Sequence, residues 1–164
     1  MKQPIAGVAP SQISETPVMF VWPSVSMFAL GRLLGRLYAI SFGGYIFTVG
    51  NFIALATAPI GALLYLLRVA PGIGRRYVLT NRRVVVQRGI SFAEDKSIEL
   101  DRFDSIRVDI RPGQAWFAAG DLIFERGGVE TFRLDAVPRP ETFRHTCLKS
   151  HHSYVGTRAA LARG

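Results

Sequence analysis

The sequence has only one cysteine, Cys147, in 164 residues. A chain with a single thiol cannot form an internal disulfide, and it cannot build a zinc site from cysteine pairs. Glycine-rich phosphate-binding signatures are missing too, because the pieces GIGRR and RGG lack a strand–loop–helix context and the lysine of a P-loop. The sequence therefore excludes a disulfide scaffold and offers no motif for nucleotide chemistry.

Catalytic and metal-binding patterns are also missing from the sequence. His145, His151 and His152 lie close together, but neither a cysteine pair nor clustered carboxylates accompany them. We therefore expect that the protein is not an enzyme and that it uses no cofactor and no metal. Cys147 falls on the expected buried side of a helix, where an inert core thiol is expected.

Charge is missing from one long stretch. No charged residue lies between Ala39 and Leu67, a run longer than the roughly 20 residues that cross a bilayer. Apolar residues make up 49% of the chain and charged residues 20%, which is too apolar a composition for a disordered chain. We expect a membrane anchor within residues 18–70, preceded by an extended polar arm at residues 1–17.

The anchor is expected to have two parts. Residues 27–38 place Arg32 and Arg36 on one helical face and leucines on the other, which is typical of a helix that lies on a membrane surface or packs against a protein. A span at about residues 43–67 should follow, although its glycines and proline also permit a hairpin. The candidates for the membrane surface are Trp22, Arg32, Arg36 and Arg68.

The formal net charge is +8, and 16 of the 20 basic residues follow residue 70. A basic surface attracts anionic lipid headgroups or nucleic acid. Acidic residues interleaved among the expected strands disfavour nucleic acid, whereas the membrane segment favours lipid. The arginines that follow Leu67 equally fit a purely topological role, because arginine-rich flanks stay on the cytoplasmic side.

From residue 71 onward apolar and polar residues alternate, and this period of two residues is typical of strands. Strands are predicted at residues 76–80, 83–88, 96–100, 105–110, 121–125 and 129–134. Pro140 then opens a helix, and Glu141 suits the positive end of that helix. One side of the helix carries Phe143, Cys147, Ser150 and Tyr154, and it should cap the sheets. The β-domain is expected at residues 71–155, with a tail at 156–164.

Several stretches resemble the bacterial pleckstrin-homology family of prokaryotic membrane proteins: RRYVLTNRRVVVQRG, IELDRFDSIRVDIRPG, GDLIFE and the helix opened by AVPRPETF. The family element Y-x-(L/I)-T-N-x-R is matched by Tyr77, Leu79, Thr80, Asn81 and Arg83. The resemblance covers about residues 17–150. It implies a mainly β fold with N-terminal membrane helices, in which a small pleckstrin-homology-like barrel or sandwich is capped by one C-terminal helix. Members often carry a two-helix hairpin before the domain, and the arginine-containing helix at 27–38 departs from that.

Two groups of residues are candidates for contacts. Four arginines near the expected bilayer suit phosphate groups and are candidates for lipid headgroups: Arg75, Arg76, Arg82 and Arg88. Arg83 is expected to serve the fold, because its turn position matches the family element. Trp116 and Phe117, between two strands, are either core residues or a protein-contact loop.

We expect a non-catalytic accessory subunit or assembly factor of a larger bacterial membrane complex, docked through its β-domain and its helices. Family modules are similar to a domain in an assembly factor of photosynthetic reaction centres, so a photosynthetic complex is one expected host. The alternative is a module that binds anionic lipid surfaces or assembles with its own copies. The expected partners are membrane lipids and other membrane subunits, at the bacterial inner membrane with the β-domain on the cytoplasmic side.

Overall fold

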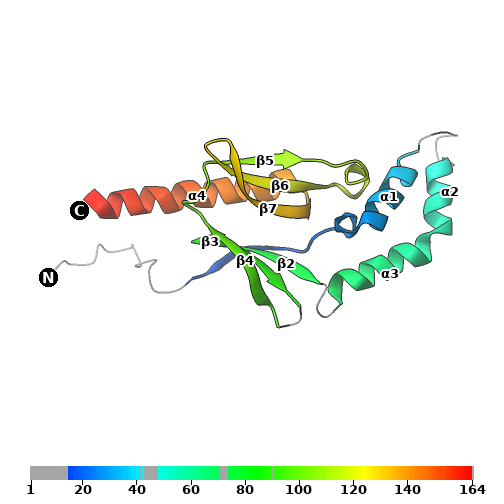
Figure 1. Ribbon diagram of the computed structural model, residues 1–164, viewed down its shortest axis with the longest axis horizontal. Coiled ribbons are helices and arrows are strands. Elements are labelled where there is room, and N and C mark those ends of the chain that lie inside the picture. Colours follow the sequence, from blue (N-terminus) through cyan, green and yellow to red (C-terminus); the bar gives the residue numbers. More distant parts are fainter. Residues whose placement is uncertain (1–14, 41, 43–47, 71–73, 90, 164) are drawn as a thin grey trace.

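The computed structural model describes residues 15–40, 42, 48–70, 74–89 and 91–163. Two antiparallel sheets and one long C-terminal helix form the body of the molecule, and three shorter helices lie together at one end (Figure 1). The C-terminal end of the long helix lies at the opposite end (Figure 1). The β-sandwich with one C-terminal helix that was expected from the sequence is therefore correct.

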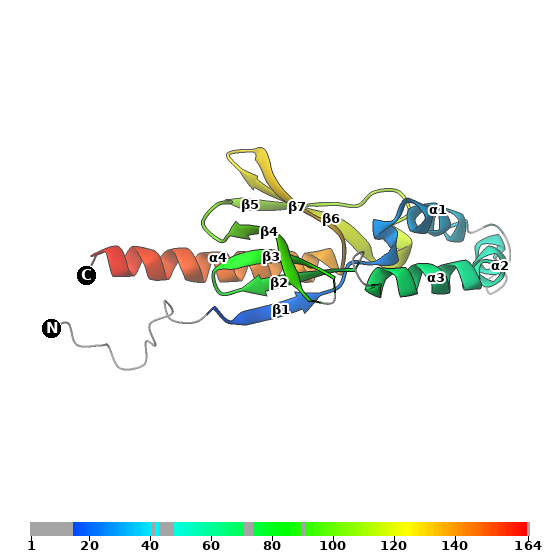
Figure 2. The ribbon, with the colours of Figure 1, turned by 60° about the horizontal axis from the view of Figure 1, so that its bottom comes forward.

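The first sheet has the strand order β1-β2-β3-β4. Its strands are β1 (Pro17–Val21), β2 (Arg75–Thr80), β3 (Arg83–Arg88) and β4 (Ala93–Glu99). The sequence predicted β2 to β4 but assigned residues 18–24 to the membrane half. In the structure β1 instead runs alongside β2, with Val21 opposite Tyr77 (Figure 2). The strand was missed because five uncharged residues next to an apolar segment do not distinguish a strand from a membrane anchor.

The second sheet has the order β5-β6-β7. Its strands are β5 (Ser105–Asp109), β6 (Ala119–Arg126) and β7 (Val129–Pro138), with the short 3₁₀ helix η2 (Ala115–Phe117) between the first two. Gly127 and Gly128 make the predicted hairpin turn with φ values of 58° and 79°, which glycine adopts without steric cost. The predicted strands and hairpin of this sheet are confirmed.

The core lies between the two sheets and the helix α4 (Pro140–Arg163). Tyr77, Leu79, Phe124 and Phe143 are fully buried in it. The helix begins at Pro140 as predicted and continues to Arg163, through residues that the sequence analysis expected to form a tail. Among the described residues no strand pairing joins the two sheets, and the domain is a sandwich rather than a closed barrel.

The N-terminal part forms four short helical segments: η1 (Val25–Met27), α1 (Ala29–Tyr38), α2 (Val49–Ala56) and α3 (Ala58–Val69). The helix predicted at 27–38 corresponds to α1. The span predicted at about 43–67 lies partly outside the described residues, and its remainder is two helices bent by 63° at Thr57. Pro59 near the start of α3 accounts for the break, because a proline cannot continue the preceding helix.

Among the described residues no single helix is long and apolar enough to cross a membrane, whereas α2 and α3 together meet that requirement by length and composition as a bent pair.

Helix α1 is held against the sandwich through a glycine. A Cβ atom on Gly35 would lie 2.1 Å from the carbonyl oxygen of Gly113, so only glycine permits this backbone approach. Of the leucines expected opposite the arginines, Leu34 is buried while Leu30 and Leu33 remain about half exposed. The helix therefore packs on its own domain with one side and keeps an apolar side exposed.

Candidate functional site

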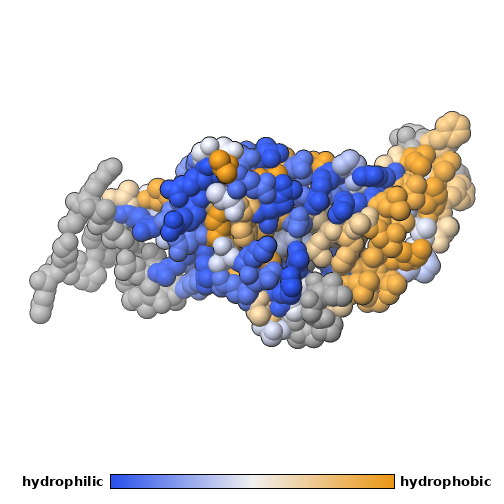
Figure 3. All heavy atoms as spheres, in the orientation of Figure 1, coloured by the Kyte–Doolittle hydropathy of each residue, from blue (hydrophilic) through white to orange (hydrophobic). Residues whose placement is uncertain are grey.

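The helical end of the molecule carries a large exposed apolar surface. Figure 3 shows this surface at the α1–α3 end, in contrast to the hydrophilic sandwich. The exposed apolar residues of α2 and α3 are Val49, Phe52, Leu55, Ile60, Leu63, Tyr65 and Leu66. Contiguous apolar patches of this kind mark protein or membrane interaction sites. We call these residues the apolar face.

The segment of the chain that contains this face carries charged residues of one sign. Between Glu15 and Glu94 the chain has eight arginines and neither lysine, aspartate nor glutamate. The rest of the chain has 12 basic and 12 acidic residues, so the formal net charge of +8 comes from this segment. A net positive charge of this size favours anionic partners, although acidic residues outside the segment pair with Arg75, Arg83 and Arg88.

The candidate headgroup arginines do not form one cluster. Arg75 and Arg88 face each other across β2 and β3, close to where the helical end joins the sheet. Arg82 lies in the turn at the other end of β2, roughly 20 Å away at about 3.3 Å per strand residue. Arg75 lies 3.8 Å from Asp135, and Arg88 lies 3.3 Å from Asp95. The expected set of four therefore divides between two ends of the sheet.

Arg76 is held in an aromatic cluster. Its guanidinium carbon lies 3.8 Å from the ring centre of Phe92 and 5.0 Å from that of Phe20, and Trp22 meets Phe92 edge to face. Gln87 accepts two hydrogen bonds from the same guanidinium, at 3.0 and 2.6 Å. Trp22 is thus half-buried within the sheet's own aromatic cluster.

Two arginines of the helical end, Arg32 and Arg36, link α1 to other elements, and Arg68 contacts its own helix. Arg32 donates to the carbonyl oxygens of Ser26 and Met27, and Arg36 donates to that of Pro112. Arg68 lies over the ring of Tyr65 at 5.0 Å. These contacts leave the guanidinium groups at the junction between the apolar helices and the sandwich.

Trp116 and Phe117 lie where α1 meets the sandwich. Trp116 meets Tyr38 edge to face at 4.8 Å, and an added Cβ atom on Gly35 would lie 2.8 Å from the Phe117 ring. A mainly apolar hollow of about 430 Å³ separates this aromatic group from α3, with Leu64 in its wall. Phe117 therefore packs against α1 at Gly35, and Trp116 contacts Tyr38 but stays half exposed.

The three histidines and Cys147 all lie on helix α4. His151 Nδ1 lies 2.5 Å from the Leu100 carbonyl oxygen, and its ring lies 5.1 Å from that of Phe103. The described part of the chain has no group of three side chains that could hold a metal. Burial raises the pKa of the Cys147 thiol, which lowers its thiolate fraction and its reactivity.

The family element at Tyr77–Arg83 binds the chain that leads into β1. The Thr16 amide donates to the side-chain oxygen of Asn81, and the Asn81 amide donates to the Thr16 carbonyl oxygen. Arg83 donates to both carboxylate oxygens of Glu15, at 2.8 and 3.0 Å, and to Glu94 at 2.9 Å. Thr80 adds a hydroxyl donor to Glu15 at 2.8 Å. The fold role expected for Arg83 is therefore a carboxylate clamp, and Glu15 was the residue that sequence reasoning missed.

Glu15→Gln is expected to destabilise the protein by about 1 kcal/mol at neutral pH, because hydrogen bonds to a charged partner are lost. Arg83 holds the pKa of the Glu15 carboxyl below its ordinary value. The carboxylate thus stabilises the folded state above the unfolded pKa of about 4.3, and this contribution disappears as the pH falls through the lower folded value. Urea unfolding of both chains at pH 7 and at pH 3 measures the difference.

A matched control is Glu99→Gln, which removes an exposed ion pair with Arg102 at 3.6 Å. Exposed pairs contribute about 0–1 kcal/mol, so this change should have the smaller effect. Equal unfolding midpoints for the two variants at pH 7 would contradict the clamp.

A buried carboxylate lies in the second sheet. Asp121 is fully buried, and its Oδ1 accepts hydrogen bonds from Gln114 at 2.7 Å and from the Ala136 amide at 2.9 Å. Its Oδ2 is paired with Arg111 at 2.5 Å and lies 3.6 Å from Arg133. A buried charge persists when it is paired and hydrogen-bonded in this way. The geometry indicates a structural ion cluster rather than a catalytic group.

The family model described as Bacterial PH domain matches residues 27–151. The matched range contains the three helices of the apolar end, strands β2 to β7 and the first half of α4. No curated protein and no solved structure matches the chain. The match confirms the resemblance drawn from the sequence, and β1 lies outside it.

Proposed function

The chain belongs to the bacterial PH domain family, and from this premise we propose that it is a non-catalytic, membrane-anchored accessory subunit of a larger bacterial membrane complex. The observation that supports this most is the apolar face of α2 and α3. In water this face would stay unburied, whereas a bilayer or an apolar partner would cover it.

The proposed arrangement inserts the bent pair α2–α3 into the membrane and leaves the sandwich at its surface. The segment's arginines and its lack of acidic residues support a cytoplasmic-side sandwich, because positive flanks remain on that side. Arg68 and Tyr65, at the end of α3, then lie at headgroup level, where aromatic and basic side chains are enriched. In the proposed role of accessory subunit, the anchor holds the sandwich at the membrane surface, where it can contact other subunits.

A second candidate function is the binding of anionic lipid surfaces by the chain alone. The eight arginines between Glu15 and Glu94 favour it, because each basic residue near an anionic surface contributes about 1 kcal/mol. Binding of this type weakens as salt rises.

Extraction from native membranes tests the proposal. The chain should resist a high-salt and carbonate wash and should leave the membrane in mild detergent with defined other subunits, which mass spectrometry then identifies. Those subunits would also decide whether the host complex is photosynthetic. Release by the wash would overturn the anchor. A homo-oligomer alone would overturn the accessory role and favour lipid binding.

A further inference from the structure

The mainly apolar hollow at the helical end, of about 430 Å³, has one wall from α1 and a facing wall from α3. Gly31, Leu34 and Leu64 are buried along it. Tyr65 and Trp116 also line it and have about half of their surfaces exposed, so they mark its opening. Pockets for small molecules have volumes of about 300–1,000 Å³ and mostly apolar walls with few polar groups. The hollow therefore has the size and the lining of a ligand site, and we call it the α1–α3 hollow.

The α3 wall of the hollow is one face of that helix. Ala58, Gly61, Tyr65 and Arg68 line it at spacings of three and four residues, which share a helical face. A Cβ atom added to Gly61 would meet no atom within 4 Å, so the wall is open at this position. From Arg68 to Ala58 the wall is about 15 Å long at 1.5 Å per helical residue. That length is about half of the roughly 30 Å hydrocarbon core, which is the depth of the acyl chains of one leaflet.

Arg68, at one end of this wall, has a donor without a partner. Its Nε atom is buried and has no hydrogen-bond partner among the described residues. Three other arginines of the acid-free segment pair with carboxylates, whereas Arg68 is in no ion pair within the described part of the chain. A buried donor that lacks an acceptor is costly, and guanidinium groups suit phosphate oxygens. The α1–α3 hollow therefore offers one cationic end and an apolar length.

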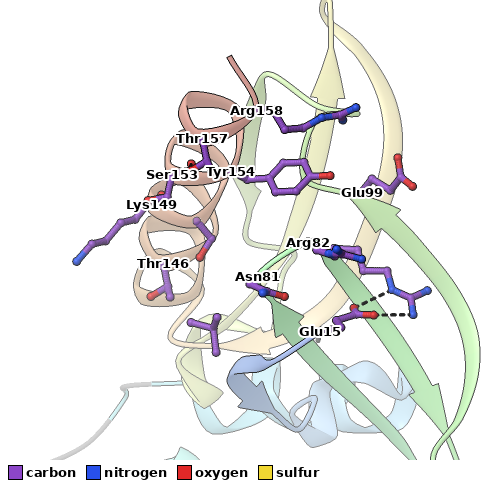
Figure 4. Close-up of a pocket in the computed structure, with 13 residues that line it drawn as sticks. Glu15, Asn81, Arg82, Glu99, Thr146, Lys149, Ser153, Tyr154, Thr157 and Arg158 are labelled. Carbon is purple, nitrogen blue, oxygen red and sulfur yellow. Dashed lines mark hydrogen bonds and ion pairs between the residues drawn. The ribbon is translucent and has the colours of Figure 1, made fainter. Parts of the chain in front are cut away.

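A larger hollow, of about 1000 Å³, lies between α4 and the turn that joins β2 to β3 (Figure 4). Its lining arginines include Arg83, which is paired with Glu15, and Arg158, which is paired with Asp101. The charges of these two arginines are balanced within the fold. Arg68 differs from them because its Nε atom has no such partner.

The α1–α3 hollow adjoins the apolar face, since Tyr65 belongs to both. With α2 and α3 in the bilayer, Tyr65 and Arg68 lie at headgroup level and the opening of the hollow meets lipid. An extended peptide fits poorly, because apolar walls leave its backbone amides and carbonyls unsatisfied. A partner helix is about 10 Å wide, and about 15 Å of its length would need roughly 1,000 Å³. An acyl chain with an anionic headgroup fits both the apolar length and the cationic end.

We propose that the α1–α3 hollow binds one anionic phospholipid, with an acyl chain along Gly61 and Ala58 and the phosphate at Arg68. This inference rests on the proposed membrane anchor, and it adds one defined lipid site to that anchor. The phosphate accepts a hydrogen bond from Arg68 Nε, and the acyl chain covers Leu34 and Leu64.

Native mass spectrometry of the delipidated full chain in mild detergent tests this, with phosphatidylglycerol and with phosphatidylcholine that has the same acyl chains. One phosphatidylglycerol should bind per chain, on the order of tenfold more tightly than phosphatidylcholine, because only the first has a net negative charge. Arg68→Gln should remove most of this preference. The control Arg126→Gln removes the same charge from an exposed position at the end of β6 and should leave the affinity unchanged.

Gly61→Leu should weaken phosphatidylglycerol binding at least about tenfold, because the added side chain fills the hollow. Folding should be retained, since the new Cβ atom meets open space and leucine favours a helix interior over glycine. The matched control is Gly156→Leu in α4, where an added Cβ atom also meets no atom within 4 Å. That control should bind the lipid like the unchanged chain.

Unchanged affinity in Gly61→Leu, equal weakening by Gly156→Leu, or equal affinity for the two lipids would overturn the proposal. If Gly61→Leu releases a co-purifying subunit but keeps its phosphatidylglycerol, the hollow belongs to a protein contact and the proposal also fails. Retention in carbonate-washed membranes reports on the anchor separately, because Gly61→Leu removes no apolar surface. A variant that keeps both the anchor and the lipid affinity defeats this inference alone.

Discussion

Asp121→Asn is expected to lower the free energy of unfolding by about 1–3 kcal/mol. The carboxylate is fully buried, and it is the common partner of Arg111 and Arg133. Asparagine keeps the size and the acceptor for Gln114 but removes the negative charge, so two guanidinium groups lose their buried counter-charge. Arg111 and Arg133 are each about one third exposed and keep Asp135 and Glu130 as partners, so the loss is smaller than for a fully buried ion pair.

Urea unfolding of the full chain in mild detergent, followed by tryptophan fluorescence, measures this effect. The control Asp95→Asn makes the same chemical change in an exposed pair with Arg88 at 3.3 Å, and it should cost about 0–1 kcal/mol. If Asp121→Asn unfolds at the same urea concentration as Asp95→Asn, the ion cluster does not stabilise the sandwich.

Replacing Leu55 and Leu66 together by aspartate is expected to remove the chain from membranes. These side chains are 75% and 68% exposed, so they contribute little to the packed core. Burial of a leucine contributes about 1.5–3 kcal/mol, and losing two lowers membrane partitioning at least 100-fold. The cost of placing two carboxylates in the bilayer adds to this loss.

Flotation with vesicles made from native lipids measures the partitioning. Val129→Asp is a matched control, because Val129 is 67% exposed but lies in the β6–β7 hairpin of the sandwich. The control should float like the unchanged chain. If the double variant still floats, or if the control no longer floats, the apolar face is not the membrane anchor.

The Asp121 substitution is expected to change the stability of the fold, whereas the Leu55 and Leu66 substitutions are expected to change membrane binding. Asp121 stabilises the sheet from which α4 and η2 are positioned, whereas Leu55 and Leu66 act only through the surrounding medium. An unfolding measurement on the leucine variant should therefore show a small change. This separation allows a loss of membrane binding to be assigned to the surface rather than to misfolding.

The local pattern of the chain was sufficient for much of the fold. Alternating apolar residues predicted β2, β3 and β5, and the glycine pair at 127–128 predicted the β6–β7 hairpin. Pro140 correctly marked the start of α4. Each of these signals lies within a few residues, because strand periodicity, turn conformation and helix starts depend on neighbouring side chains and backbone angles.

The positions of the candidate site residues depended on contacts between parts of the chain that are distant in the sequence. Residues 75 and 82 belong to one basic segment in the sequence, yet the sheet separates them. Conversely, Glu15 and Arg83 are 68 residues apart but form the clamp. The register of β1 on β2 brings them together, and no hairpin turn fixes that register, because three helices separate the two strands along the chain.

The sequence by itself determined the presence of strands between residues 76 and 134, the helix that begins at Pro140 and the acid-free segment whose arginines carry the net charge. Only the tertiary structure decided that β1 joins the sheet, that Asp121 is buried among arginines and that a hollow lies between α1 and α3. The physical reason is that propensity and charge are properties of short segments. Burial, pairing and concavity instead arise when elements far apart in the sequence pack together.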